Sequence, residues 1–323
     1  MSFVQPVKIA VVGAGKAGAS FAYAALLRGL ASELVLIDKD VARAEGEAMD
    51  LQHTIPFSQP AEIRAGTLLD TAGSAITVIC AGKRLNPGQT PSDVLEPNAA
   101  VIKEIIPQIA DVNPDGIIIV ATNPVDVLTY GAWKLSGLSR RQVIGTGTIL
   151  ETARFRYLLG RHFRIEPRSV HAYILGENGQ SEVPIWSSAS IAGMPLTEIC
   201  KAHGCDASAL DDIFDVTRNS GAAVLERKGS PNNAIATALV RMVEAILHDE
   251  KAVFSVSSVL LGEYGMSEVA LSVPTVLSRE GVDRILRVQL NDREVAELLL
   301  SGRKIHSAIN FADFVVKGAL KAS

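Results

Sequence analysis

A glycine-rich turn near the start of the chain constrains the fold more than any other feature of the sequence. The run from Gly13 to Gly18 reads GAGKAG and matches the pattern GxGxxG, with Gly15 as its second glycine. The apolar run VKIAVVG (7–13) leads into it, as expected of a strand buried on both faces of a parallel sheet, and helical periodicity follows over 16–30. A strand, a glycine turn and a helix in this order predict the first βαβ unit of a dinucleotide-binding domain.

An acidic residue at the end of the next apolar run strengthens this interpretation. Asp38 closes the run ELVLID (33–38) and lies twenty residues after Gly18. In a dinucleotide site such an aspartate accepts hydrogen bonds from the ribose hydroxyls of the adenosine and repels a 2′-phosphate. Gly13 is expected to permit the tight turn, Gly15 to let the pyrophosphate approach the backbone, and Gly18 to let the helix pack closely on the sheet. The sequence therefore predicts NAD as the cofactor, with NADH bound more tightly than NADPH.

Strand-like and helical runs alternate through the first part of the chain, and the pattern changes after about Thr148. The early strand-like runs are 7–13, 33–38, 61–65, 75–81 and 116–121, and the early helical runs are 16–30, 41–53 and 98–112. This alternation predicts a doubly wound parallel sheet with right-handed crossovers. The later strand-like runs are 170–174, 182–190, 253–261 and 269–277, and helical runs lie at 151–161, near Cys200, at 211–228, at 233–247 and within 292–320. We therefore expect an α/β protein with a Rossmann-type NAD-binding domain over residues 1–147, an α+β substrate domain over residues 148–323, and a substrate cleft between them.

The charge and the cysteine content exclude several classes of protein. The chain has 323 residues and a formal net charge of -4, and its lysines and arginines are scattered, so nucleic acid and membrane surfaces are not expected partners. No apolar run approaches the ~20 residues of a membrane span, and no signal peptide precedes the first strand. The odd set of Cys80, Cys200 and Cys205 predicts a reducing, cytoplasmic setting without disulfides, and the lone His203 between the last two predicts no metal site.

Several longer stretches of the chain match one enzyme family. They are MDLQH (49–53), CAGKRLNPGQT (80–90), ATNPVDVLTY (121–130), ETARFRYLLG (151–160), HAYILGENG (171–179) and LGEYG (261–265). In these stretches the chain resembles the L-lactate/L-malate dehydrogenase family, and most of all the bacterial L-lactate dehydrogenases. The resemblance implies NAD-dependent oxidation or reduction at the α-carbon of a small carboxylate, a mobile loop that closes over the substrate, and a homo-oligomer, either a tetramer or a dimer.

The residues that act on the substrate carbonyl in this family are changed together. The resemblance places Asn178 where the family has its acid/base histidine, Glu151 where it has the aspartate that orients the histidine, and Pro91 where it has the carbonyl-polarising arginine of the loop. An asparagine amide donates a hydrogen bond but does not titrate near neutral pH, so it cannot replace the histidine as an acid. The arginine that grips the substrate carboxylate is retained as Arg154, and a planar guanidinium suits that task better than a lysine.

The resemblance also assigns the walls of the site. Leu85 occupies the specificity position of the loop, Gly221 replaces an alanine on the opposite wall, and Pro231 replaces a threonine. Gly82 and the retained Asn123 are assigned to the cofactor side, with Asn123 also close to the reacting atoms. These changes indicate a pocket that is rebuilt around a preserved carboxylate anchor.

One type of reaction accounts for this selective loss. Hydride transfer to an imine, or from an amino acid in the reverse direction, needs no histidine acid, because the nitrogen already carries its proton. Glu151 is then the candidate partner of the cationic nitrogen, and ordinary pyruvate reduction is expected to be weak or absent. Two other hypotheses stay open: a catalytically silent NAD(H)-binding protein that serves as a sensor or structural subunit, and a redox-neutral enzyme that uses bound NAD transiently.

Two further residues match an effector site of the bacterial lactate dehydrogenases. Arg156 and His171 stand where that group has the arginine and histidine that bind fructose 1,6-bisphosphate across a subunit interface. Either residue alone is more often structural, but together they indicate an effector anion site. The same resemblance predicts a homotetramer, with a dimer as the alternative.

Overall fold

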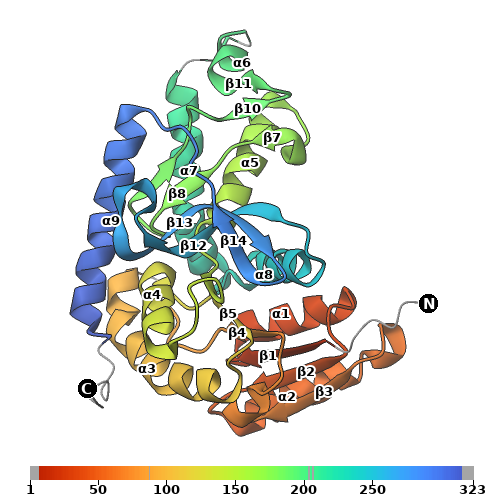
Figure 1. Cartoon of the computed structure of the whole chain (residues 1–323). Coiled ribbons are helices and arrows are strands. Elements are labelled where there is room, and N and C mark those ends of the chain that lie inside the picture. The colour runs from red at the N-terminus through yellow and green to blue at the C-terminus, as the bar shows by residue number, and fades with distance from the viewer. Residues whose placement is uncertain (1–6, 87, 203, 206, 315–323) are drawn as a thin grey trace, which may run out of the picture.

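The computed structural model describes residues 7–86, 88–202, 204–205 and 207–314. In Figure 1 the N-terminal part of the chain, red to yellow, forms the lower layer, and the C-terminal part, green to blue, lies above it. The N-terminal part contains strands β1 (Lys8–Val12), β2 (Glu33–Ile37), β3 (Glu62–Gly66), β4 (Ile76–Ile79), β5 (Ile117–Val120) and β6 (Val143–Gly145), helices α1 (Lys16–Leu27), α2 (Val41–Gln52), α3 (Leu95–Val112) and α4 (Val125–Ser136), and short helices η1 (Ile55–Phe57), η2 (Leu68–Thr71) and η3 (Pro91–Val94).

The strands of the N-terminal part pair in parallel in the order β3-β2-β1-β4-β5-β6. The chain order switches direction between β1 and β4, and open α/β sheets bind ligands outside the carboxyl ends of their strands at such a point. Alternate residues of β1 face two separate cores. Ile9 and Val11 belong to the core that includes α1 and α8, whereas Ala10 and Val12 belong to the core that includes α3, α4 and α9. The strand is buried on both faces, as its uninterrupted apolar run predicted.

The C-terminal part mixes antiparallel strands with long helices. It contains strands β7 (Val170–His171), β8 (Ile174–Gly176), β9 (Glu182–Pro184), β10 (Ser190–Ile191), β11 (Met194–Pro195), β12 (Ala252–Leu261), β13 (Ser267–Ser278) and β14 (Gly281–Ile285), helices α5 (Ile149–Phe163), α6 (Leu196–Ala202), α7 (Ala207–Lys228), α8 (Asn232–Leu247) and α9 (Asp292–Ala312), and short helices η4 (Pro167–Ser169) and η5 (Glu263–Gly265). The predicted fold class, a Rossmann-type doubly wound sheet with a second α+β part, is confirmed. Among the helices that the structure describes, none is long and apolar enough to cross a membrane.

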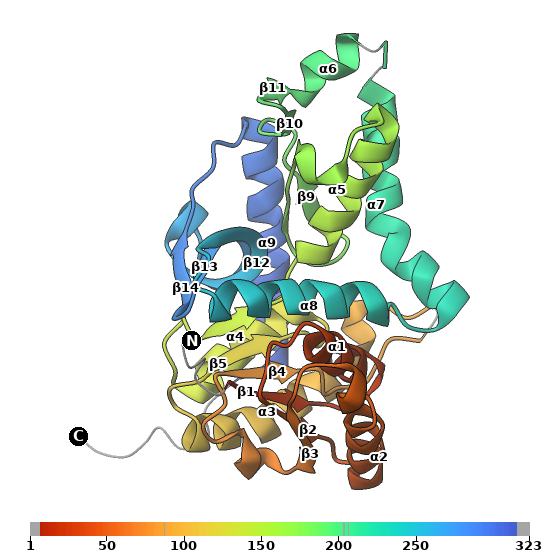
Figure 2. The ribbon, with the colours of Figure 1, turned by 90° about the vertical axis from the view of Figure 1, so that its right-hand side faces the viewer.

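The two parts are joined by one continuous sheet and by packing between helices. Strand β6 pairs with β12 through Gly145 and Ser257, so the parallel sheet continues into the antiparallel series β12-β13-β8-β9. Glycine allows this contact, because a Cβ at position 145 would lie 2.8 Å from the Cβ of Ser257. Figure 2 shows α8 lying across the top of α1, where Asn232 Nδ2 donates a hydrogen bond to Ser20 Oγ at 2.7 Å. The substrate-side elements are therefore fixed against the cofactor-side sheet.

Some predicted elements differ from the observed ones. The run 170–174 is divided between β7 and β8, and the run 182–190 is divided between β9 and β10, which belong to different sheets. Pro184 has no N–H to continue the β9 ladder. No element was predicted over 122–147, where α4 and β6 lie. Helix α4 is buried at every position from Val125 to Ala132, so its sequence lacks the one-sided periodicity by which surface helices are predicted.

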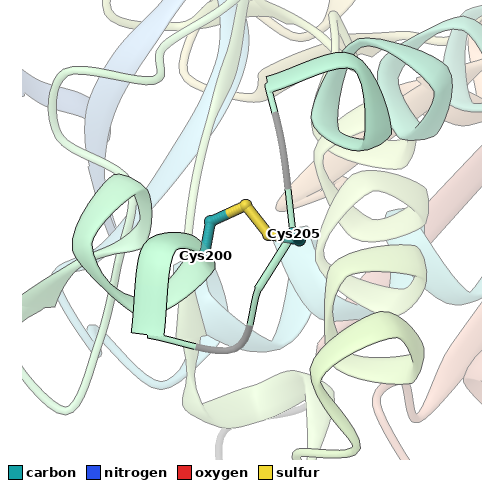
Figure 3. The surroundings of a disulfide bond; sticks show 2 residues. All are labelled: Cys200 and Cys205. Carbon is teal, nitrogen blue, oxygen red and sulfur yellow. A yellow bond between two sulfur atoms is a disulfide. The ribbon is translucent and has the colours of Figure 1, made fainter.

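The absence of disulfides was predicted wrongly for one cysteine pair. Cys200 and Cys205 are joined by a disulfide, drawn in Figure 3, across the turn that ends α6. The backbone N–H of Cys205 donates to the carbonyl oxygen of Cys200 at 3.0 Å, so the turn brings the two Cα atoms to 5.0 Å, within the range that a disulfide spans. Cys80 is a free thiol, and burial raises its pKa to about 12. His203 lies outside the described residues.

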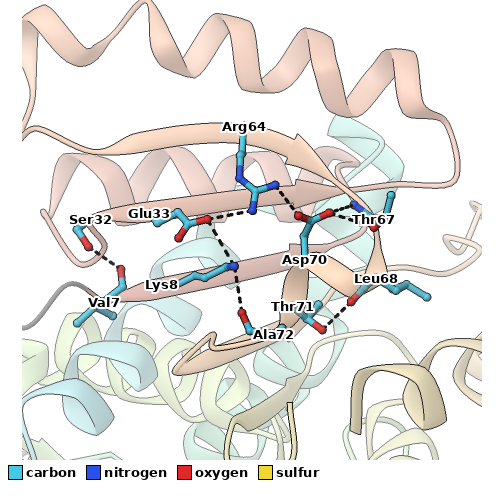
Figure 4. Close-up of polar contacts among 10 residues, drawn as sticks. All are labelled: Val7, Lys8, Ser32, Glu33, Arg64, Thr67, Leu68, Asp70, Thr71 and Ala72. Atoms are coloured by element: carbon cyan, nitrogen blue, oxygen red, sulfur yellow. Dashed lines mark hydrogen bonds and ion pairs between the residues drawn. The ribbon is translucent and has the colours of Figure 1, made fainter. Parts of the chain in front are cut away.

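An ion-pair network ties the edge of the parallel sheet together, as Figure 4 shows. Arg64 on β3 contacts Glu33 on β2 at 3.1 Å and Asp70 on η2 at 2.8 Å, and Lys8 on β1 contacts Glu33 at 3.5 Å. A hydrogen bond from the backbone of Thr67, followed by the Arg64 guanidinium, lowers the pKa of Asp70 to about 2. These contacts connect β1, β2, β3 and η2 at the outer part of the parallel sheet.

Candidate active site

The glycine turn brings three strands together at the carboxyl edge of the sheet. Gly13 has a φ of +104°, and its N–H donates to the carbonyl oxygen of Ile37 at 2.7 Å. A Cβ at Gly13 would lie 2.4 Å from the backbone nitrogen of Ala81, and a Cβ at Gly18 would lie 2.0 Å from the carbonyl oxygen of Gly13. Both approaches therefore require glycine, the first between strand ends and the second between helix and turn.

Gly15 has a different environment, which fits the cofactor. A Cβ built there would meet nothing within 4 Å, so open space lies in front of α1. The first turn of α1 has no acidic residue, and no side chain caps its N-terminus. The free N–H groups and the positive end of the helix dipole are thus available to a phosphate, as a pyrophosphate would need. The residues of this turn fit a bound dinucleotide.

Asp38 buttresses the turn with both of its oxygens. Its Oδ2 accepts a hydrogen bond from the backbone N–H of Ala14, and its Oδ1 accepts one from the N–H of Asp40, both at 2.9 Å. An ionised carboxylate has about four acceptor sites, so Asp38 keeps capacity for ribose hydroxyls. The side chain is half-buried at the end of β2, next to the turn.

Asn98, a residue that was not predicted from the sequence, organises the neighbouring loops. Asn98 on α3 is fully buried, and its Oδ1 accepts from the N–H of Lys83 at 2.6 Å while its Nδ2 donates to the carbonyl oxygens of Lys83 at 3.0 Å and Asn123 at 2.7 Å. A Cβ at Gly82 would lie 2.9 Å from Asn98 Oδ1. Gly82 and Asn123 therefore lie together where β4 and β5 end. A polar residue inside the apolar stripe of α3 is the signal that could have revealed Asn98.

Glu151 and Arg154 form a buried ion pair one turn apart on α5. Arg154 Nη1 donates to Glu151 Oε1 at 2.9 Å, and the side chains are only 17% and 12% exposed. Burial raises the pKa of Glu151, and the positive charge of Arg154 opposes this shift. Arg154 Nη2 and Nε make no hydrogen bond to the described residues. The guanidinium thus retains two donors that can form a fork to a carboxylate.

Asn178 is held so that its amide presents an acceptor. Its Nδ2 donates both to the carbonyl oxygen of Gly147 and to Glu151 Oε2, each at 2.8 Å. The carbonyl oxygen can only accept, so this orientation of the amide is fixed by its partners. Both amide hydrogens are used, and among the described contacts Oδ1 has no partner. A group that enters here meets an oxygen lone pair instead of the donor that a protonated histidine would offer.

A second acidic residue, also missed by the sequence analysis, holds the backbone of Asn178. Asp126, near the start of α4, is 1% exposed, and its Oδ2 accepts from the N–H of Asn178 at 2.7 Å. Burial is the main reason why the pKa of Asp126 rises to about 7. Ser272 Oγ lies 3.4 Å from Asp126 Oδ1 and accepts from the N–H of Thr148 at 3.0 Å. The loop that carries Asn178 is therefore anchored to α4, to β13 and to the start of α5.

The predicted site residues fall into two groups at one edge of the sheet. Gly221 on α7 joins the Arg154 group, because a Cβ at this position would lie 3.5 Å from Arg154 Nη1. The Asn178 amide reaches Gly147, two residues after the end of β6, and β6 pairs with β5, after which Asn123 lies. The substrate-side group and the cofactor-side group are therefore neighbours at the carboxyl ends of β5 and β6.

For the other predicted pocket residues, the described contacts show no link to Arg154. Pro231 precedes Asn232, the first residue of α8, which contacts α1 beside the glycine turn. Leu85 is half-buried in the loop after β4, and none of the described contacts joins it to Arg154. Pro91 begins η3, and its side chain lies outside the described part of the chain. The predicted roles of these residues stay predictions.

Arg156 and His171 lie on the surface away from this site. Arg156 Nη2 donates to the carbonyl oxygen of Arg168 at 3.1 Å, and His171 on β7 is exposed. Both residues can be reached from solvent, and their role in binding an effector anion stays a prediction. Among the described residues no group of three or more histidine, cysteine, aspartate or glutamate side chains is arranged to hold a metal ion.

Comparison with known proteins gives matches over nearly the whole chain. Residues 7–145 match the NAD-binding domain of lactate/malate dehydrogenase, and residues 148–313 match the α/β C-terminal domain of the same family. An L-lactate dehydrogenase of Acetivibrio thermocellus is 45% identical over 308 residues, with 95% of this chain and 97% of the relative covered. L-lactate dehydrogenase 1 of Clostridium acetobutylicum is 43% identical, with 94% and 97% covered.

Solved structures agree with these matches. The minor L-lactate dehydrogenase of Enterococcus mundtii superimposes with a TM-score of 0.91 at 36% identity, covering 95% of this chain and 98% of that one. A lactate dehydrogenase from a deep-sea metagenome library of the Medee basin gives the same TM-score at 37% identity, with 95% and 99% covered. The similarity therefore includes both parts of the chain.

Proposed function

The chain belongs to the lactate/malate dehydrogenase family, and from this premise we propose how its altered site works. It is an NAD-dependent oxidoreductase of the lactate dehydrogenase type. We propose that it transfers hydride at the α-carbon of a small carboxylate, and that the atom beside this carbon is the nitrogen of an amino or imino acid instead of an oxygen.

The orientation of the Asn178 amide carries this proposal. Both Nδ2 hydrogens are bound to Gly147 and Glu151, so Oδ1 is the amide atom left for a substrate. An acceptor suits the N–H of an amine or iminium group, whereas a ketone oxygen is itself an acceptor and would be repelled. The negative charge of Glu151, one hydrogen bond behind Asn178, favours a cationic nitrogen at this position.

Arg154 is the proposed anchor of the substrate carboxylate. Its Nη1 is occupied by Glu151, and Nη2 and Nε supply a two-bond fork. Gly221 leaves space beside the guanidinium, because it has no Cβ, and a Cβ at this position would contact Arg154 Nη1. The carboxylate on Arg154 and the nitrogen at Asn178 would then fix the α-carbon from two sides, which is the positioning that hydride transfer needs.

The proposed reaction is balanced without a histidine acid. In the direction of oxidation the substrate ammonium group releases one proton to solvent, and hydride then leaves the α-carbon, which gives an iminium group and a reduced cofactor. In the direction of reduction the iminium group already carries its two protons, the α-carbon receives the hydride, and the resulting amine takes up one proton from solvent. NAD, when bound, supplies the nicotinamide ring that accepts or donates the hydride. Arg154, Asn178 and Glu151 orient the substrate and neutralise its charges, and Asn178 transfers no proton.

Ordinary interconversion of a 2-oxo acid and a 2-hydroxy acid is the second candidate function. The similar proteins are named L-lactate dehydrogenase, which favours this reaction. It requires a proton donor for the carbonyl oxygen, and the Asn178 amide does not titrate near neutral pH. The two candidates share the cofactor and the carboxylate anchor, so only the reacting atom separates them.

The test is a steady-state measurement of NADH oxidation with pyruvate, with and without ammonium or methylamine. We expect oxidation that depends on the amine, and a sharp rise in KM for Arg154→Lys, because a point charge replaces the two-bond fork. Oxidation at the same rate with and without amines would reject the nitrogen proposal and favour the second candidate.

The oligomeric state and the effector site are two further proposals. We infer a homotetramer or dimer, and an effector anion site at Arg156 and His171, from the resemblance of the sequence to the bacterial L-lactate dehydrogenases. Analytical ultracentrifugation with and without fructose 1,6-bisphosphate tests both, because an effector that bridges subunits shifts the protein toward the larger assembly.

A further inference from the structure

A cavity lies between strand β9 and helices α7 and α9. It is close to the proposed substrate site of Glu151, Arg154 and Asn178, but none of these three residues lines it. Its volume is about 340 Å³, which is within the range of small-molecule sites. Apolar walls come from Val183, Pro184, Trp186, Phe214 and Leu300, and polar or charged side chains line the remainder. Taking about 30 Å³ for a water-sized group, the cavity has room for on the order of ten non-hydrogen atoms.

Glu182 gives this cavity its chemical character. The residue is only 6% exposed, and its Oε1 is buried without a hydrogen-bond partner among the described residues. No ion pair to its carboxyl group is formed by the described side chains. Burial, and then the negative charge of Glu151, raise the pKa of Glu182 to about 8. A buried carboxyl group with an unused acceptor is costly unless something else satisfies it.

The cationic side chains at the cavity do not meet this need. Arg218 is paired with Asp215 at 2.7 Å and lies 5.3 Å from the centre of the Phe214 ring, and Arg293 is paired with Glu297 at 2.8 Å. Lys304 on α9 is exposed to solvent. The charged groups that act on Glu182 or line the same cavity come from every packed element: Glu151 and Arg154 on α5, Glu177 before β9, Asp211 and Arg218 on α7, and Arg293, Glu294, Glu297 and Lys304 on α9.

Glu294, the other strongly buried carboxyl group at the cavity, is fully engaged. It is 3% exposed, accepts from the N–H of Ser187 at 2.9 Å and from its hydroxyl at 2.6 Å, and closes the capping box of α9. Glu182 is therefore the buried carboxyl group of the cavity that still lacks a donor. The walls are apolar, and the Glu182 carboxyl group can release its proton and then accept a hydrogen bond. The complementary ligand is therefore an apolar molecule that ends in a cationic hydrogen-bond donor.

We propose that this cavity binds a small organic amine in its ammonium form, with the nitrogen at Glu182 and the apolar stem along Trp186 and Phe214. On binding, Glu182 gives its proton to solvent and forms a charge-assisted hydrogen bond with the ammonium group. The side chains of Trp186 and Phe214, which line the cavity, add apolar contact for the alkyl stem.

Helix α7 connects the cavity with Arg154, the proposed anchor of the substrate carboxylate. Asp211, Phe214 and Arg218 are spaced by three and four residues, so they share one face of α7, and Gly221 continues that face to Arg154. An amine in the cavity is thus either the far end of a substrate whose carboxylate lies on Arg154, or a separate ligand next to it. In either case an ammonium group meets the Glu182 carboxyl group.

The test uses butylamine as the probe and isothermal titration calorimetry of the full-length protein, which requires no turnover and so does not depend on the proposed function. We expect butylamine to bind at pH 7, and 1-butanol, which has the same apolar stem but no cationic nitrogen and no carboxylate for Arg154, to bind far more weakly. Glu182→Gln should weaken butylamine binding about tenfold or more, because a charge-assisted bond becomes a neutral one. Glu297→Gln is the matched control, since Glu297 lines the same cavity but is already paired with Arg293, and it should change the affinity less than about twofold.

A measurement on the unmodified protein keeps the test valid if Glu182→Gln does not fold. Titrations in buffers of different ionisation enthalpy count the protons released on binding, and we expect about one proton at pH 7, because Glu182 must ionise. Butylamine and propanoate are then titrated together in the presence of NADH. If they compete, the cavity holds the far end of the substrate, and if they bind at the same time, the cavity holds a separate ligand. Both results support an amine site at Glu182. No binding of butylamine, equal binding of 1-butanol, or an unchanged affinity of Glu182→Gln would overturn the proposal.

Discussion

Replacing Asn178 with aspartate tests the orientation of the amide on which the proposed chemistry depends. The two side chains have the same shape, so Asn178→Asp changes only the hydrogen-bonding capacity and the charge. Nδ2 donates at 2.8 Å to the carbonyl oxygen of Gly147 and at 2.8 Å to Glu151 Oε2. In the variant a carboxylate oxygen faces both acceptors, and two favourable contacts become repulsive ones.

The size of the effect follows from charge separation and burial. Two carboxylates whose charges lie about 4 Å apart repel each other by about 4 kcal/mol at an effective dielectric constant of 20. Arg154, which is paired with Glu151 at 2.9 Å, offsets part of this repulsion. We therefore expect the folded state to lose about 2–4 kcal/mol when both groups are ionised. At a pH where the introduced carboxyl group is protonated, its O–H can donate to Glu151 and most of this loss disappears.

The pH dependence gives the prediction its sign. The pKa of the introduced carboxyl group is raised in the folded state, so the variant should match the unmodified protein near pH 4 and fall behind it as the pH rises to 8. Thermal unfolding at several pH values measures this, with about 2 °C or more lost for each kcal/mol. Asn219→Asp is the matched control, because Asn219 is exposed on α7 and its Nδ2 donates at 2.8 Å to the backbone carbonyl oxygen of Asp215 and to no carboxylate of the described residues.

A particular result would refute this reasoning. If Asn178→Asp is as stable as the unmodified protein at pH 8, Nδ2 does not face Gly147 and Glu151, and Oδ1 is not the atom presented to a substrate. A loss of stability equal at all pH values would show a general packing defect instead of repulsion between carboxylates.

Three further changes have definite expected outcomes. Gly18→Ala should weaken NADH binding about tenfold or more, measured by fluorescence titration, because the new Cβ would lie 2.0 Å from the carbonyl oxygen of Gly13, whereas Gly46→Ala on α2, where nothing lies within 4 Å, should leave the affinity unchanged. Arg154→Lys should raise KM for the carboxylate substrate far more than it lowers NADH affinity, and an equal effect on both would place Arg154 outside the substrate site. Glu182→Gln should become progressively more stable than the unmodified protein as the pH rises from 5 to 8, because the pKa of Glu182 is raised to about 8 and ionising it destabilises the folded protein; a difference in melting temperature that does not change with pH would contradict this.

The sequence predicts the cofactor half of the fold well because that half obeys local rules. Gly13, Gly15 and Gly18 each have the environment that their spacing indicates: two forced contacts and one open space. Strand β1 is buried on both faces, as its continuous apolar run requires. A short pattern suffices there, because the turn, the strand and the helix are adjacent in the chain.

The substrate half is predicted less completely because its contacts join residues that are distant in the sequence. Asn178 is bound to Glu151, 27 residues earlier, and to Asp126, 52 residues earlier, and no local pattern reveals those pairings. Glu182 looks like an ordinary strand residue in the sequence, and only its burial between α7 and α9 shows that it lacks a partner. The Cys200–Cys205 disulfide depends on a turn that brings two Cα atoms to 5.0 Å, which composition does not predict.

The most direct test of the central claim follows a labelled hydride into the product. The protein is incubated with pyruvate, ammonium and NADH that carries deuterium at the transferable position of its nicotinamide ring, and the products are identified by mass spectrometry. If Asn178 Oδ1 receives a substrate nitrogen and Arg154 the carboxylate, the deuterium should appear at the α-carbon of alanine, and the yield should follow the ammonium concentration. Deuterium found mainly in lactate, at a yield that ammonium does not change, would contradict the account.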